Sequence, residues 1–289
     1  MSYVYFSKTK YRIRNKSLVI GDRDIRSVKN IKGLSRKTDL TELALMNDAI
    51  YKIEGLSKLI SLKTLSLIRN KIEEISGLEG NKNIERLNLK SNHIVKIQGL
   101  DTLTNLRSLS LAMNKIEEIC GLEHNFQLES LDLYGNKIER IKNLSHLEKL
   151  KVLEISNNKI KKIENLDSLE NLEYLSIEHN KFQKIEGLNN LKKLRILNLR
   201  GNSLQKIEGL EELKNLELLT LSFNKITEIQ GFDKLHKLKT LDLRCNKISD
   251  IKNIESIKDI KSVELSGNPI KFEERKIIYN QFKNIYIPL

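Results

Sequence analysis

The sequence contains few residues whose types and spacing suit catalysis or metal binding. His124 and His146 lie 22 residues apart, and Cys120 and Cys245 each lack a neighbouring cysteine. Two histidines could hold a metal weakly, but no third ligand recurs at this interval, so exposed side chains are the better interpretation. His179 and Cys245 are too far apart to form a catalytic pair. The sequence has no phosphate-binding GxxxxGK[ST] loop, GxSxG turn or HExxH helix. It therefore predicts a protein that is not an enzyme, with no metal and no cofactor.

The residue with the clearest chemical regularity is asparagine, which recurs every 22 positions. The series is Asn70, Asn92, Asn114, Asn136, Asn158, Asn180, Asn202, Asn224, Asn246 and Asn268, with Asp48 one step earlier. A carboxamide can donate to one backbone group and accept from another. Because an unpaired buried backbone group costs about 1–3 kcal/mol, we predict that the asparagines satisfy a buried turn. We assign this series a structural role.

The elements that must position these asparagines follow from the residues around them. The pattern LxxLxLxxNxI restarts every 22 residues from Leu40 to Ile260, which is typical of a leucine-rich repeat. Its alternating part predicts a short strand that pairs in parallel with its neighbours at about 4.8 Å. We predict an α/β repeat fold, a leucine-rich-repeat solenoid. Its parallel β-sheet should lie on the concave face, and short turns or 3₁₀ helices on the convex face.

A second regularity lies at the sixteenth position of each unit, where only glycine and asparagine occur. Its members include Gly77, Gly99, Asn143, Asn165 and Gly187. These are the two residue types that most readily adopt a positive φ. We therefore predict a positive φ, or a cap of the following turn, at all five.

The array divides the chain into one body with two caps. Residues 1–39 form the amino-terminal cap, with a hairpin turn at residues 7–10, and 40–268 form the repeats. Residues 269–289 form the carboxy-terminal cap, with a helix over 272–283 whose apolar face carries Phe272, Ile277, Ile278, Tyr279 and Phe282, and a strand over 285–287. Asn81 and Asn125 replace a leucine at position twenty, where we expect the outer segment to be reshaped.

The composition predicts a soluble monomer in the cytoplasm or nucleus. The two cysteines lie about six coils apart, too far for a disulfide. The amino terminus lacks the apolar core of a signal peptide, and no apolar run is long enough to span a membrane.

The net charge of +13 has two open interpretations. Lysines follow most asparagines and could steer a polyanion, either nucleic acid or an anionic membrane surface. Glutamates alternate with them, which favours a solvated edge. The lysines are Lys71, Lys115, Lys137, Lys159, Lys181, Lys225 and Lys247, and the glutamates are Glu73, Glu117, Glu139, Glu164, Glu186 and Glu208. On the polyanion interpretation, we expect weak binding that is sensitive to salt.

The phrase NKIKKIENLDSLENL, from Asn158, resembles the 22-residue class of leucine-rich repeats, as do the segments from Asn180 and Asn224. This class includes the nuclear regulatory subunit of protein phosphatase 1, a spliceosomal protein, axonemal dynein-associated proteins and bacterial internalins. Asn268-Pro269-Ile270 before a helix is similar to the cap of the first two. The resemblance implies a phosphatase catalytic subunit as a partner. The phosphatase regulator alternates aromatic and acidic residues at position five, where this chain has acids but no aromatics.

Position three of the repeat supplies the strongest candidate for a binding surface. It is polar in the first five units and apolar in the next four, at Val152, Tyr174, Ile196 and Leu218. Side chains here should face solvent from adjacent strands, so the four should form one stripe. We predict a non-catalytic scaffold that binds a protein on its concave face through this stripe and flanking residues. The flanking residues are Tyr134, Glu154, Glu178, His179, Arg200 and Phe223.

Overall fold

The computed structural model describes residues 2–288, which group into two compact units. The first extends to Leu150, and the second begins at Lys151 and also contains Glu139–Ile141. The sequence predicted one continuous array. Repeats contact mainly their sequence neighbours, so a long array can separate into compact units without any change in the repeat.

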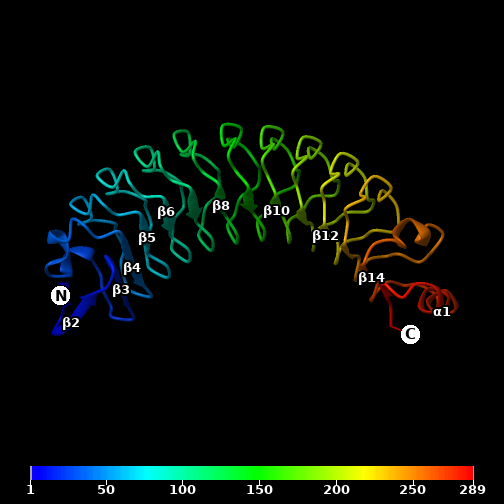
Figure 1. The fold of residues 1–289 in the computed structure, drawn as a ribbon, viewed down its shortest axis with the longest axis horizontal. Coiled ribbons are helices and arrows are strands. Elements are labelled where there is room, and N and C mark those ends of the chain that lie inside the picture. Colours follow the sequence, from blue (N-terminus) through cyan, green and yellow to red (C-terminus); the bar gives the residue numbers. More distant parts are fainter. Residues whose placement is uncertain (1, 289) are drawn as a thin grey trace. The chain divides into compact units, whose positions relative to one another are not determined.

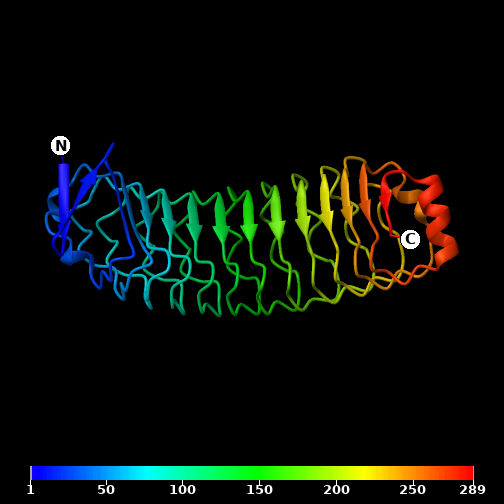
Figure 2. The same cartoon turned by 90° about the horizontal axis from the view of Figure 1, so that it is seen from below.

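The first unit begins with an antiparallel hairpin and continues as a parallel sheet. Strand β1 (Ser2–Phe6) pairs with β2 (Thr9–Ile13), which confirms the predicted turn. The parallel strands lie side by side in chain order (Figure 2). They are β3 (Ser17–Gly21), β4 (Glu42–Met46), β5 (Thr64–Ser66), β6 (Arg86–Asn88), β7 (Ser108–Ser110) and β8 (Ser130–Asp132). Two 3₁₀ helices, η1 (Val28–Asn30) and η2 (Leu34–Arg36), precede β4.

The second unit continues the same repeat and ends in a helix and a short strand. In each coil the strand lies along one side and the turns along the other (Figure 1). The parallel strands are β9 (Val152–Glu154), β10 (Tyr174–Ser176), β11 (Ile196–Asn198), β12 (Leu218–Thr220), β13 (Thr240–Asp242), β14 (Ser262–Glu264) and β15 (Ile285–Tyr286). The helices are η3 (Ile254–Ile257) and α1 (Phe272–Gln281).

The core is built by the leucines and isoleucines that the repeat pattern identifies. Leu175 and Ile177, at positions four and six of one coil, are fully buried, and so are their equivalents in the other coils. Because side chains alternate along a strand, positions three and five point away from this core. The repeat therefore separates a uniform interior from a variable outer side of the sheet, which we call the sheet face.

The asparagines satisfy the buried turn as predicted. The Nδ2 of Asn114 donates to Leu89 O at 3.0 Å and to Leu111 O at 2.9 Å. Its Oδ1 accepts from the N–H of Ile94 at 3.0 Å. Each side chain thus connects its own coil to the preceding one. Asp48 has no amide group to donate, so it only accepts: its Oδ1 receives hydrogen bonds from the N–H groups of Arg23 and Ile25.

The backbone at position sixteen confirms the prediction for the five residues named above, whereas Asn253, at the same position, has a φ of −104°. Gly77, Gly99 and Gly187 have φ values of 72°, 67° and 68°, and Asn143 and Asn165 have 58° and 59°. A Cβ on Gly99 would lie 2.3 Å from Ile75 O. Asn143 instead donates from Nδ2 to the equivalent carbonyl, Ile119 O, at 2.8 Å. The asparagine is therefore accommodated by a hydrogen bond at the point where glycine avoids a collision.

A second left-handed position, which the sequence did not reveal, follows the strand at position eight. Arg69, Met113, His179, Phe223 and Cys245 all have φ between 49° and 57°. Their N–H groups bond to the next coil, as in His179 N to Arg200 O at 2.8 Å. Glycine or asparagine occupies this position in five of the eleven units, at Asn47, Gly135, Asn157, Gly201 and Gly267. Because the side chains point to solvent, other residue types are also accepted, so the preference is weaker than at position sixteen.

Two expectations for particular segments need correction. In α1, only Ile278 and the following Phe282 are buried, whereas Phe272, Ile277 and Tyr279 are exposed. Asn81 and Asn125 are fully buried and keep the same turn as the leucines they replace. The outer segment is not reshaped, because each Nδ2 bonds to two carbonyls of the preceding coil.

Candidate functional site

The four apolar residues at position three of β9 to β12 lie next to one another on the sheet face of the second unit. Tyr174 pairs in register with Val152 on one side and Ile196 on the other, and Ile196 pairs with Leu218. The side chain of Val152 is 36% exposed, and the other three are half-buried. We call this set the apolar stripe. Its spacing, about 4.8 Å between strands, makes it roughly 15 Å long.

Tyr174 is held at the centre of the stripe by Glu154. Its hydroxyl donates to Glu154 Oε2 at 3.3 Å, while the N–H of Ser156 donates to Glu154 Oε1 at 2.8 Å. Burial raises the pKa of the Glu154 carboxyl, against the lowering effect of these hydrogen bonds. Burial and the nearby Glu154 also raise the pKa of Tyr174, so its hydroxyl stays protonated and can donate. The ring is thus fixed in one orientation before any partner arrives.

A row of polar contacts continues beside the stripe from coil to coil. Ser156 and Ser176 are buried, with their hydroxyl oxygens 2.8 Å apart, and the N–H of Glu178 donates to Ser156 Oγ at 3.0 Å. Asn198 Nδ2 in turn donates to Glu178 Oε2 at 3.0 Å. Sequence reasoning identified the two glutamates but missed the serines. The only sequence signal for the serines is that Ser176 and Ser156 occupy positions five and seven, whose side chains point away from the core.

Three of the predicted flanking residues form the rim of this surface. The Arg200 guanidinium carbon lies 4.5 Å from the centre of the Phe223 ring, which is 47% exposed. The imidazole of His179 lies over Gly201, where an added Cβ would be 2.4 Å from Nδ1. Gly201 is therefore needed to make room for His179. The structure brings these residues and the stripe together on one unit.

Tyr134 is the one predicted residue that belongs to the first unit. It follows β8 and is half-buried. Its N–H donates to Asp132 Oδ1 at 3.1 Å, and its carbonyl accepts from the N–H of Met113. We therefore describe it separately from the surface on the second unit.

The histidines singled out for metal binding have other contacts. His146 packs edge-on against Phe126, with ring centroids 5.8 Å apart, and its Nε2 lies 2.8 Å from Leu122 O. His124 is exposed. Over residues 2–288, no three histidine, cysteine or acidic side chains gather in a group that could hold a metal ion.

The lysines and glutamates that follow the repeat asparagines form one edge of the coils, which we call the basic edge. It contains both paired and unpaired lysines. Lys137, Lys161 and Lys162 form long ion pairs of 3.6–3.7 Å with glutamates. Lysines of the second unit with no ion pair in the described part of the chain are Lys159, Lys181, Lys184, Lys206, Lys225 and Lys247. Exposed pairs of this kind contribute about 0–1 kcal/mol each. The edge is therefore a solvated surface with a surplus of positive charge.

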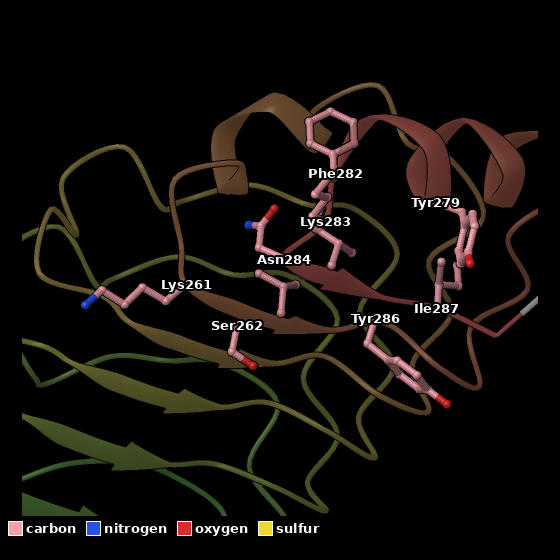
Figure 3. Close-up of a pocket in the computed structure, with 10 residues that line it drawn as sticks. Lys261, Ser262, Tyr279, Phe282, Lys283, Asn284, Tyr286 and Ile287 are labelled. Atoms are coloured by element: carbon pink, nitrogen blue, oxygen red, sulfur yellow. The ribbon is translucent and has the colours of Figure 1, made fainter.

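A pocket of about 630 Å³ lies at the carboxy-terminal cap (Figure 3). It is lined by β15 together with the end of α1 and the start of β14. Tyr279 and Tyr286 extend from different elements beside it, and both are more than half exposed. The pocket is distinct from the apolar stripe.

The structure is a solenoid of coils joined by parallel strands, and four neighbouring coils of the second unit carry the apolar stripe on their sheet face. Two family models match the chain: "Leucine Rich repeats (2 copies)" at residues 82–124 and 214–256, and "Leucine-rich repeat" at residues 124–234. Together they cover more than half of the 289 residues. The chain therefore contains leucine-rich repeats over residues 82–256, arranged as a solenoid.

Solved structures show the same fold. An internalin of Listeria monocytogenes is 28% identical, with a TM-score of 0.83, over 95% of this chain and 82% of that one. A leucine-rich-repeat protein of Leptospira interrogans is 22% identical, with a TM-score of 0.64, over 94% and 83%. Mouse RP105, solved in complex with MD-1, is 24% identical, with a TM-score of 0.80, over 94% and 50%. No curated protein matches significantly in sequence.

These matches establish the repeat class at the level of fold. The resemblance to the phosphatase regulatory subunit is not confirmed by them and stays a prediction. Within residues 2–288, no helix has the length and apolar character needed to cross a membrane.

Proposed function

We propose that this protein binds a protein partner on the sheet face of its second unit, with the apolar stripe at the centre of the contact. The single observation that supports this most is the change at position three. Four adjacent strands carry Val152, Tyr174, Ile196 and Leu218, and the strands on either side of them within the repeat carry polar residues. Solenoids of this kind present extended surfaces to their partners.

Strand propensity alone does not account for the stripe. Apolar and aromatic residues suit strands in general, but that preference acts equally on Thr240 and Ser262, which follow in the same sheet. Tyr174 also has the properties of an anchor, because its ring is preorganised by Glu154 and aromatic residues dominate interface energetics.

A phosphatase catalytic subunit, which the sequence resemblance implied, would be contacted through position five. In the second unit that position holds Glu154, Ser176, Asn198, Thr220 and Asp242, none of them aromatic. Since the aromatic ring lies at position three instead, we propose a partner that contacts position three.

The test is the double substitution Tyr174→Ala with Ile196→Glu, assayed against a partner recovered by affinity capture. Affinity should fall at least about tenfold, or about 1.4 kcal/mol, because the anchor is lost and a charge is placed in the contact. The thermal midpoint should stay nearly unchanged, because neither side chain lies in the core. Ser262→Glu adds the same charge at position three, two coils beyond the stripe, and should bind like the wild type. Unchanged affinity in the double variant contradicts the proposal.

A second candidate function is weak binding of a polyanion, supported by the unpaired lysines of the basic edge. Lys181, Lys184 and Lys206 are exposed and have no acidic partner among residues 2–288, although Glu186 and Glu208 lie on the same edge. Counterion release makes such binding fall steeply as salt rises. Contact through the apolar stripe should change little with salt, so a salt titration separates the two functions.

A further inference from the structure

The two arginines at position seven of the second unit, Arg200 and Arg244, differ in whether their charge is satisfied. Arg244 binds Asp242 through two parallel hydrogen bonds, from Nε to Oδ1 at 2.9 Å and from Nη2 to Oδ2 at 2.8 Å. Arg200 has no ion pair with any described residue. Its Nε is buried and has no hydrogen-bond partner in the part of the chain that the structure describes.

The difference arises at position five, two residues earlier. Arg244 is preceded there by Asp242, and Arg200 by the neutral Asn198. Both ends of the Asn198 amide bond to groups other than the Arg200 guanidinium. Its Oδ1 accepts from the N–H of Arg200 at 3.2 Å, and its Nδ2 donates to Glu178 Oε2 at 3.0 Å. The guanidinium of Arg200 is therefore left without the carboxylate that its counterpart has.

The position of this guanidinium is nevertheless fixed. Its central carbon lies 4.5 Å from the centre of the Phe223 ring, and the carbonyl oxygen of Arg200 accepts from the His179 N–H at 2.8 Å. Stacking on an aromatic face leaves the edge of a guanidinium available for the two-pronged hydrogen bond that a carboxylate accepts. The arginine lies in the same coil as Ile196, so an anion bound there would be next to the apolar stripe.

From this geometry we infer that Arg200, stacked on Phe223, is a binding site for a single carboxylate of the protein partner, presented next to an apolar side chain that covers Ile196 and Leu218. This rests on the proposed function of the stripe. The surrounding charges favour one carboxylate over a chain of phosphates, because Glu154 and Glu178 lie on the same face and repel an extended polyanion.

The probe is a phage-displayed library of random dodecapeptides, selected against the full chain. We expect enrichment of Asp or Glu beside an aliphatic or aromatic residue. A synthetic peptide of the enriched sequence is then measured by calorimetry against Arg200→Gln, Asn198→Asp and Arg244→Gln, with the thermal midpoint of each variant as a folding control.

Arg200→Gln should lower peptide affinity at least about tenfold, since the charge that pairs with the peptide carboxylate is lost. Asn198→Asp should do the same, because it supplies Arg200 with the internal carboxylate that Asp242 gives Arg244. Arg244→Gln removes the same charge from the same repeat position and should change affinity less than about threefold, because that guanidinium is already occupied.

The other outcomes are each decisive. One such outcome is a set of peptides without acidic residues that bind Arg200→Gln as well as the wild type but do not bind the Tyr174→Ala, Ile196→Glu variant. This outcome overturns the inference and leaves the proposed function standing. A selection in which no peptide depends on either the stripe or Arg200 overturns both. Binding of a single-stranded oligouridylate that depends on Arg200 overturns the inference in favour of nucleic-acid phosphate.

Discussion

Replacing one asparagine of the repeat tests how the coils are joined. Asn114→Ala removes the acceptor of the Ile94 N–H, which has no other partner in the turn. The two N–H bonds of Asn114 Nδ2 are shared among three carbonyls, and each carbonyl keeps a second donor. Leu89 O accepts from Asn92, Leu111 O from Asn136, and Ala112 O from the N–H of Ser91. The substitution therefore leaves one buried donor unpaired and removes two N–H donors from carbonyls that stay paired.

The magnitude follows from this difference. An orphaned buried N–H costs about 1–3 kcal/mol, and each lost hydrogen bond to a carbonyl that stays paired costs about 0.5–1.5 kcal/mol. Asn114→Ala should therefore lower the free energy of unfolding by about 2–6 kcal/mol in urea unfolding followed by circular dichroism. Asn105→Ala, which removes one exposed hydrogen bond to Lys82 O, should cost less than about 0.5 kcal/mol.

A charged variant adds a test by pH. Asn114→Asp keeps the acceptor but points a buried carboxylate at carbonyl oxygens, which raises its folded pKa above the unfolded value of about 3.9. The stability that the protonated form of the new carboxyl group provides is then fully present below the unfolded pKa and is lost as pH rises through the folded pKa. Asn114→Asp should therefore be closer to wild type at pH 4 than at pH 7. A loss under about 0.5 kcal/mol for Asn114→Ala, or no pH dependence for the aspartate, would refute the structural role of the asparagines.

Three further outcomes follow from other positions. Gly99→Ala should lower the thermal midpoint more than Gly33→Ala. Both glycines have a positive φ, but only at Gly99 would a new Cβ collide with a backbone oxygen, Ile75 O. An equal decrease in the two variants would show that backbone strain alone sets the thermal midpoint. Glu154→Gln should stabilise the protein at pH 7 and lose this advantage as pH falls. The raised pKa of Glu154 means that its charged form opposes folding, and a constant difference across pH would contradict this. Asn125→Leu should change the free energy of unfolding in urea by less than about 1.5 kcal/mol, although it removes two hydrogen bonds from Nδ2. Both carbonyls keep a backbone donor, and the buried Oδ1, which has no partner among residues 2–288, is removed at the same time; a loss above about 3 kcal/mol would contradict this.

The repeat could be predicted from sequence because burial and backbone geometry restrict the residue types. Asn114 and Gly99 have few acceptable alternatives, so their period exposed the strands, the turns and the left-handed position sixteen. Position eight has the same left-handed backbone but a weaker signal, because residues such as Gly135 alternate there with the solvent-facing Met113 and Phe223. A geometric constraint leaves a clear sequence signal only when it also restricts the side chain.

The candidate site was predictable in outline only. The alternation of strand residues identified the stripe, but the hydroxyl contact from Tyr174 to Glu154 depends on side-chain orientation, which the pattern does not encode. Arg200 and Arg244 occupy the same repeat position and look equivalent in sequence. Their difference becomes clear only when the hydrogen bonds of Asn198 are known.

Site-specific photo-crosslinking tests the proposed binding surface most directly. A benzoylphenylalanine placed at Ile196 lies in the apolar stripe, and the same probe at the exposed Gln205 lies elsewhere on the same coil. In lysate of the source cells, the probe at position 196 should give a discrete crosslinked protein that disappears when Tyr174→Ala is added, and the probe at position 205 should not. Equal crosslinking from both positions, or crosslinking at 196 that does not change with Tyr174→Ala, would contradict binding through the stripe.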